Sequence, residues 1–345
     1  MIIFMVIAAV VCCLKMQPTE KTIHEDYLMP VQTTALRGTM IVLVFLSHVR
    51  DYVVLNGLGD PLFNAILRII GQSMVAPFFF YSGYGIMVSY GNKKDYKQGF
   101  LRKRVGLTWI HFAVAVCFYY AVDLLLGIHY PFRVFLQSLS GWSDVGNSNW
   151  FMFVTFGLYF IAYLGIIICE RMEKQQQERK KILAVLILLF SGVFLAGMTL
   201  VKEPWWYDTL LCFAFGSFYA ILKEKIDSFC KKRKNYGIYI ALILTFYILA
   251  FHSGGYLSAN LQACMFTLLI TAVTMHLKIQ NPILMWLGKH SFYIYIYMRI
   301  PMIVMKHFEI LITHPVVFTL VSFTVTCLTA WGMYQFHKKT DTFIF

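Results

Sequence analysis

Arg37 and His48 are the residues of this sequence whose types and spacing point most directly to chemistry. They lie in an apolar run at 36–55, LRGTMIVLVFLSHVRDYVVL, which is long enough to cross a bilayer. Ionisable side chains are costly in hydrocarbon, so a span that keeps them usually has a use for them. Eleven residues make about three helical turns, which puts both side chains on one face, roughly 16 Å apart along the axis. This face predicts a site that holds an anion and moves a proton.

His48 is the predicted proton carrier, because an imidazole exchanges protons near neutral pH. Asp51 follows three residues later on the same side of the helix and is predicted to orient the ring. The alternative is a buried His–Asp pair, with Arg50, that only holds helices together. Arg37, expected where the span meets the cytoplasm, would bind a phosphate bidentately. Its alternative role is to extend toward lipid phosphates.

Other polar groups in or beside apolar runs are candidates for binding donor and substrate. The cluster Arg102, Lys103 and Arg104 is suited to a polyphosphate, although a basic flank of a membrane span would look the same. Arg299 needs a partner or a cavity, and Asp123 is its candidate counter-ion. The predicted pore or substrate residues are Tyr81, Ser82, Gly83, Trp150, Ser291, Tyr295 and Arg299. Helix packing, a kink or interfacial anchoring would also explain several of them.

The composition identifies the class of protein that must position these residues. The chain has 345 residues, of which 59% are hydrophobic and 14% charged, and its mean hydropathy is +0.65. Soluble domains carry about 25% charged residues, so this composition predicts a polytopic membrane protein. The eight cysteines form no CxxC or Cys/His pattern with metal-ligand spacing. We therefore expect no disulfide framework, no metal site and no bound cofactor.

Apolar runs along the chain predict an all-α transmembrane bundle of about 10–11 helices. The runs are 1–14, 37–55, 72–90, 105–127, 150–169, 182–201, 209–222, 236–252, 260–277, 291–308 and 315–336. The outside loop 128–149 would either lie on the surface or dip back and cap a cavity.

The loops between these runs alternate in charge, which predicts the orientation of the bundle. Most of the 30 lysines and arginines lie in or beside alternate loops, namely 15–36, 91–104, 170–181, 223–235, 278–290 and 337–345. The other set of loops holds only Arg68, Arg133 and Lys202. Positive residues stay on the cytoplasmic side, so the C-terminus is predicted to be cytoplasmic. The net charge of +13 then reflects topology and contact with anionic lipid, and nucleic-acid binding is excluded.

Several segments, in this order, resemble the acyltransferase type 3 family of integral membrane acyltransferases. LRGTMIVLVFLSH is similar to the family's Arg, ten residues, His pattern, and APFFFYSGYGIMV to its Pro-Phe-Phe-Phe-x-Ser-Gly segment. FLRKRVGLTW, NWFMFVTFGLYF, FAFGSFYA and LGKHSFYIYIY resemble later motifs. The chain departs from the pattern at Leu107, where no second Arg follows Arg104, and at Arg299, where the family's late helix ends in His.

The resemblance implies a plasma-membrane enzyme that moves an acyl group, expected to be acetyl, from acetyl-CoA to a hydroxyl of a cell-surface carbohydrate or glycolipid. Residues 31–345 would form the transmembrane domain, and 1–30 an extra hydrophobic segment with a cytoplasmic linker. Acetyl-CoA would be a co-substrate that meets the donor-binding residues Arg37, Arg102, Lys103 and Arg104, while His48 acts as base or acyl carrier with Asp51. The protein would either finish the transfer itself or hand the acyl group to a separate extracytoplasmic transferase or glycan-synthesis partner.

Two other classes of protein would use a similar set of residues. A secondary transporter or exporter of a polysaccharide precursor would use intramembrane Arg, His and Asp as a substrate and proton relay. No inverted repeat is visible in the sequence, which weighs against this class. The third class is a structural subunit of a polysaccharide-synthesis complex.

Overall fold

The computed structural model describes residues 1–19, 23–93 and 95–344, and it is almost entirely helical. The positions left out fall in the predicted cytoplasmic loops 15–36 and 91–104 and at residue 345. Within the described residues, eight helices are long and apolar enough to cross a membrane. The predicted all-α, multi-pass bundle is therefore confirmed.

Every predicted apolar run coincides with a helix. The helices are α1 Ile2–Cys13, α2 Pro30–Val49, α3 Asp60–Ile70, α4 Ala76–Asn92, α5 Leu107–Leu125, α6 Phe132–Leu139, α7 Trp150–Glu170, α8 Gln176–Val201, α9 Cys212–Cys230, α10 Arg233–Ser253, α11 Gly255–Thr274, α12 Pro282–Tyr297, α13 Arg299–His307 and α14 Pro315–Ile344. Short 3-10 turns span Gly71–Met74 and Pro204–Trp206, and a π-helical turn spans Arg102–Gly106. The strands β1 Met16–Pro18 and β2 Leu277–Ile279 pair antiparallel, with Met16 opposite Ile279.

Helix α2 begins and ends earlier than the sequence predicted. Pro30 occupies its first turn, where the ring's fixed φ suits a helix and the missing N–H costs nothing. Beyond Val49 the Nζ of Lys306 donates to the carbonyl of Asp51, at 2.8 Å, and supports the chain as it leaves the helix. Arg37 therefore lies two turns inside α2 rather than at its end, and His48 lies in the last turn.

The predicted run 291–308 is two helices, α12 and α13, that meet at Met298. Pro301 explains the break, because it has no N–H to donate to the carbonyl of Tyr297 four residues earlier. Arg299 consequently begins α13 instead of lying in the middle of a span.

Helices α2 and α12 pack at backbone contact through glycines. A Cβ atom on Gly38 would lie 2.1 Å from the carbonyl oxygen of Leu284, and one on Gly288 would lie 1.8 Å from that of Thr34. Any side chain at either position would push the two helices apart. Small residues that allow such close approach are typical of interfaces between membrane helices.

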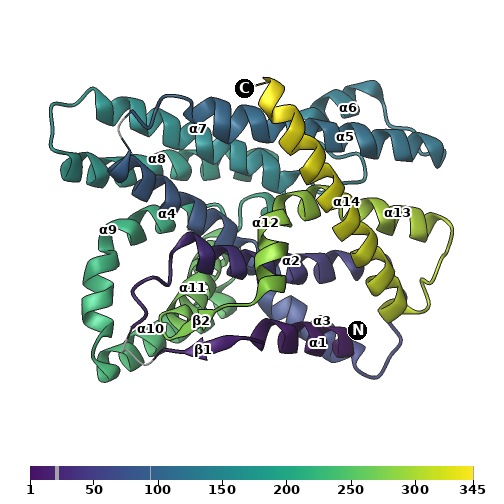
Figure 1. Ribbon diagram of the computed structural model, residues 1–345, viewed down its shortest axis with the longest axis horizontal. Coiled ribbons are helices and arrows are strands. Elements are labelled where there is room, and N and C mark those ends of the chain that lie inside the picture. The colour runs from purple at the N-terminus through teal and green to yellow at the C-terminus, as the bar shows by residue number, and fades with distance from the viewer. Residues whose placement is uncertain (20–22, 94, 345) are drawn as a thin grey trace.

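Helices α4 and α9 form a second pair of the same kind. A Cβ on Gly83 would lie 2.0 Å from the carbonyl oxygen of Phe213, and one on Gly216 would lie 1.9 Å from that of Phe80. Figure 1 shows α7 and α8 side by side along the upper edge, while α12 crosses in front of α2.

Contacts between loops follow the predicted sides of the membrane. Strands β1 and β2 come from two predicted cytoplasmic loops, and Lys97 forms an ion pair of 2.7 Å with Glu170 between two others. On the opposite side, the amino group of Met1 forms a buried ion pair of 2.9 Å with Asp60. Segment 1–30 therefore contacts the bundle at both ends of α1, and its separation from the domain at 31–345 stays a prediction.

We predict that Gly288→Ala destabilises the protein by about 1–3 kcal/mol, the usual cost of overpacking, because α12 must move away from α2. The measurement is thermal unfolding of the purified protein in detergent. Gly332→Ala on α14 is the matched control, since a Cβ there meets nothing within 4 Å. Equal melting temperatures for the two variants would show that α2 and α12 do not depend on the glycine contact.

Candidate functional site

One face of α2 lines two cavities. Arg37, Ile41 and Val44 line a cavity of about 270 Å³, and Val44 and His48 line a second cavity of about 650 Å³. These residues recur every three or four positions, as a single helix face requires. Val44, Val75 and Tyr295 line both cavities, so the two share a wall. The structure thus joins the predicted Arg37 and His48 positions along one lined stripe.

The Arg37 end of the stripe holds two guanidinium groups. Nη2 of Arg37 donates to Oγ1 of Thr34 at 2.9 Å. Arg104 lies near enough for its positive charge to repel that of Arg37. The Arg104 guanidinium lies 6.0 Å from the centre of the Tyr159 ring, whose hydroxyl is 3.4 Å from Oγ of Ser82. Among the described residues, no carboxylate forms an ion pair with either arginine. Two like charges without a counter-ion favour an incoming anion.

Arg102 and Lys103 line a cavity that Arg104 does not line. All three lie on the π-helical turn at the start of α5, and such turns are frequent at functional sites. Arg102 and Lys103 are exposed and line a third cavity, of about 510 Å³, together with Lys97. The predicted basic cluster therefore divides: Arg104 lies over Tyr159, which lines the Arg37 cavity, whereas Arg102 and Lys103 line the third, exposed cavity.

The His48 cavity is polar and aromatic. Its lining includes Ser47 and four of the predicted site residues, namely His48, Asp51, Trp150 and Tyr295. The Asp51 carboxylate is 59% exposed and forms an ion pair with Arg50 at 3.5 Å. In the described part of the chain it makes no hydrogen bond to the His48 ring, and the orienting role of Asp51 stays a prediction.

Arg299 reaches this end of the stripe from α13. Its Nε donates to the hydroxyl of Tyr52 at 2.8 Å. Its positive charge also exerts an electrostatic effect on His48. The expected pairing with Asp123 is wrong. Asp123 is buried, and its Oδ2 has no hydrogen-bond partner in the described structure. The carboxylate that attracts the Arg299 guanidinium electrostatically is that of Asp144. Loop 128–149, which carries Asp144, could not be placed from the sequence.

The two halves of the loop 128–149 differ: residues 141–149 pack mostly into the bundle, whereas His129, Phe132 and Arg133 in the first half are exposed. Val145 and Asn147 are buried, and the hydroxyl of Tyr295 donates to the carbonyl of Ser148 at 2.6 Å. Lys202 donates to the carbonyl of Trp142 at 2.7 Å and lies 3.8 Å from the centre of that ring. Burial lowers the pKa of Lys202. Because Tyr295 lines both cavities, the loop closes over the wall that they share.

The remaining predicted residues divide between the cavities and the packing of the helices. Ser82 and Ser291 line the Arg37 cavity. Tyr81 instead bonds the hydroxyl of Thr271 at 3.2 Å, and Gly83 contacts the backbone of α9, so neither lines either cavity.

Tyr159 and His111 line the Arg37 cavity and were not predicted as site residues. Tyr159 follows Thr155 by four positions in the otherwise apolar α7, and this polar pair on one helix face was the available signal. His111 carried no signal of its own, because its partners come from the other end of the chain.

One of the comparisons with known proteins gives a match. A family model described as "Acyltransferase domain" matches residues 33–335, nearly the whole chain. No curated protein and no solved structure gives a match.

We predict that Tyr295→Phe loosens loop 140–149, because the hydrogen bond to Ser148 is lost, at a cost of about 1 kcal/mol. The measurement is amide hydrogen exchange of that loop, which should become faster. Tyr297→Phe is the control, since the buried Tyr297 hydroxyl has no hydrogen-bond partner among the described residues. Unchanged exchange in Tyr295→Phe would mean that this bond does not hold the loop.

Proposed function

Because the chain belongs to this acyltransferase family and is a membrane acyltransferase, we propose that it moves an acyl group, most simply acetyl, from acetyl-CoA to a hydroxyl of a cell-surface carbohydrate or glycolipid. The observation that carries the proposal is the α2 face, on which Arg37 lines one cavity and His48 lines the adjoining one. A donor with phosphates suits the first cavity, and an acceptor with hydroxyls suits the second.

The donor enters from the cytoplasmic side in this proposal. Arg37 and Arg104 form bidentate, charge-assisted hydrogen bonds with its phosphates, and the surface cations Arg102 and Lys103 attract it. Beyond Arg37 the cavity wall is mainly apolar, with Phe78, Phe79, Leu158 and Phe292 among its residues. Such a wall accommodates the long pantetheine arm and directs the thioester toward the wall shared with the His48 cavity.

His48 is the base of the transfer step. Its imidazole takes the proton of the acceptor hydroxyl, and the oxygen attacks the thioester carbonyl carbon. The carbon–sulfur bond then breaks, the ester forms, and the coenzyme A thiolate leaves and is protonated. His48 could also accept the acyl group first and pass it to the hydroxyl, with the same overall balance of atoms.

The acceptor is proposed to be a carbohydrate because of the side chains around His48. Trp150 and Tyr295 offer aromatic faces, while Ser47 and Asp51 offer polar groups to sugar hydroxyls. His48 lies in the last turn of α2, and the basic loop 15–36 precedes that helix, which supports an acceptor on the side opposite the basic loops. The plasma membrane is the proposed location, with the acceptor outside the cell. A separate extracytoplasmic transferase or glycan-synthesis protein is the proposed partner that presents or receives the acylated group.

We predict that His48→Gln abolishes acyl transfer while donor binding stays intact, because Gln keeps a polar group of similar size but cannot accept the proton. The readout is label from acetyl-CoA appearing on surface glycan of cells that produce each variant. Coenzyme A binding to the purified variants is measured in parallel. Arg37→Gln should raise the dissociation constant for coenzyme A by about 10-fold or more, as expected for one charge-assisted bond.

His129→Gln and Arg133→Gln are the matched controls, because both residues are exposed in or beside α6, away from the cavities. Both should label glycan at the rate of the unaltered protein. Equal labelling by His48→Gln and the unaltered protein would refute the role of His48. Glycan that is made but retained inside the cell would point to export instead.

A further inference from the structure

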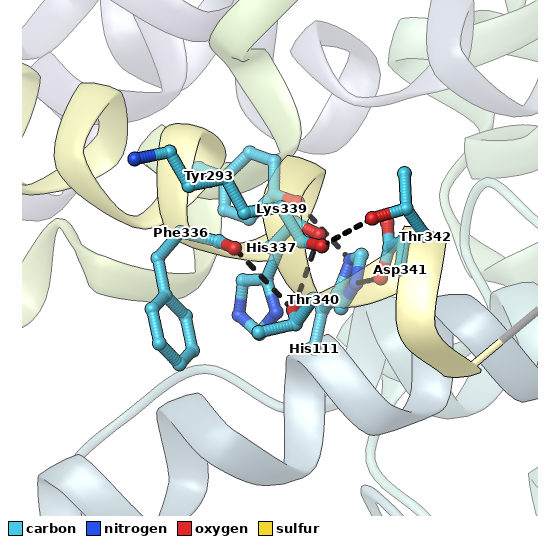
Figure 2. Close-up of polar contacts among 8 residues, drawn as sticks. All are labelled: His111, Tyr293, Phe336, His337, Lys339, Thr340, Asp341 and Thr342. Atoms are coloured by element: carbon cyan, nitrogen blue, oxygen red, sulfur yellow. Dashed lines mark hydrogen bonds and ion pairs between the residues drawn. The ribbon is translucent and has the colours of Figure 1, made fainter.

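Three side chains near the cytoplasmic end of the bundle converge between α5 and α14. They are His111 from the first turns of α5 and His337 and Asp341 from the last turns of α14. His337 and Asp341 are four residues apart, so they share one face of α14. Figure 2 shows both facing His111, and the three ligand atoms all lie within 4.8 Å of one another.

The two imidazoles are buried, and one ring nitrogen lacks a hydrogen-bond partner in the part of the chain that the structure describes. His111 is 6% exposed and His337 is 2% exposed, with ring centroids 3.9 Å apart. Nε2 of His337 has no hydrogen-bond partner among the described residues. A buried polar atom without a partner is costly and needs an explanation. A ligand bound between the two rings would supply that partner.

Tyr293 holds His111 in the orientation that a metal ligand needs. Its hydroxyl lies 3.1 Å from Nδ1 of His111, while Nε2 of the same ring lies 2.9 Å from Oδ1 of Asp341. A histidine that binds a metal through one nitrogen usually donates a hydrogen bond from the other. With Nδ1 donating to Tyr293, Nε2 of His111 is directed at the space that it shares with His337 and Asp341.

We propose that His111, His337 and Asp341 bind one divalent cation of the zinc class. Two imidazoles and one carboxylate are a donor set that zinc and its first-row neighbours prefer, whereas magnesium and calcium prefer oxygen alone. Zinc bonds of about 2.0–2.1 Å place tetrahedral ligands about 3.4 Å apart. The ligand atoms therefore need to shift relative to one another by no more than about 1.5 Å, and small side-chain rotations achieve such a shift.

The cation would join the end of α14 to the wall of the Arg37 cavity, because His111 lines that cavity. This would fix α14 against α5, two helices that are far apart in the sequence. Local sequence spacing could not predict this site, since Asp341 and His111 are separated by 230 positions. The expectation that the chain has no metal site rested on local spacing alone.

The test is the metal content of the full chain, purified in detergent with an affinity tag that contains no histidine. After dialysis without chelator, mass spectrometry of the elements should find about one zinc per chain. Cobalt added to protein stripped of metal should give visible absorption typical of a tetrahedral nitrogen and oxygen site. His337→Ala and Asp341→Asn should each lower zinc affinity by about 10-fold or more.

His290→Ala is the matched control, because His290 is 3% exposed and its Nε2 also lacks a partner in the described residues, but it is not part of the cluster. It should keep the metal. The proposal is overturned if the unaltered protein holds no zinc and cobalt gives no absorption, or if Asp341→Asn keeps zinc as tightly as His290→Ala. Asp341→Asn keeps the size of the side chain, so the test stands even if His337→Ala fails to fold.

Discussion

The main constraint on the structure is Arg37, whose guanidinium lies two turns inside an apolar helix, where a charge is costly. A charged residue at the centre of a span costs about 2.5–3.5 kcal/mol on insertion scales, and no carboxylate in the described residues neutralises Arg37 by an ion pair. The chain manages this cost by keeping one face of α2 against a cavity. On another face, Gly38 and Gly288 bring α12 to backbone contact and exclude lipid.

The break between α12 and α13 completes the other end of the stripe. Arg299 begins α13 just after this break, which follows from Pro301, and its guanidinium bonds the hydroxyl of Tyr52. The positive charge of Arg299 then exerts an electrostatic effect on His48 at this end of α2. The hydroxyl of Tyr295 donates to the carbonyl of Ser148 in loop 140–149. Because Tyr295 lines both cavities, this hydrogen bond holds the loop against the wall that the cavities share.

Local patterns were enough to predict the helices and the shared face of Arg37 and His48, while the sidedness of the loops stays a prediction. Those features depend on hydropathy and on the helical period, which neighbouring residues determine. The pairing of Arg299 was predicted wrongly because counter-ions are set by three-dimensional packing, which brought Tyr52 and Asp144 to it instead of Asp123. The ends of α2 were misplaced because hydropathy alone does not register Pro30 as a helix start. His111, His337 and Asp341 meet only after α14 packs against α5.

The central claim is that the two ends of one α2 face serve the donor and the transfer step. An electron cryo-microscopy structure of the full chain with a non-hydrolysable acetyl-CoA analogue tests it most directly. The account predicts density for the phosphates against Arg37 and Arg104, with the acyl end directed past Val44 toward His48. Phosphates bound away from both arginines, or an acyl end that points away from the His48 cavity, would contradict it.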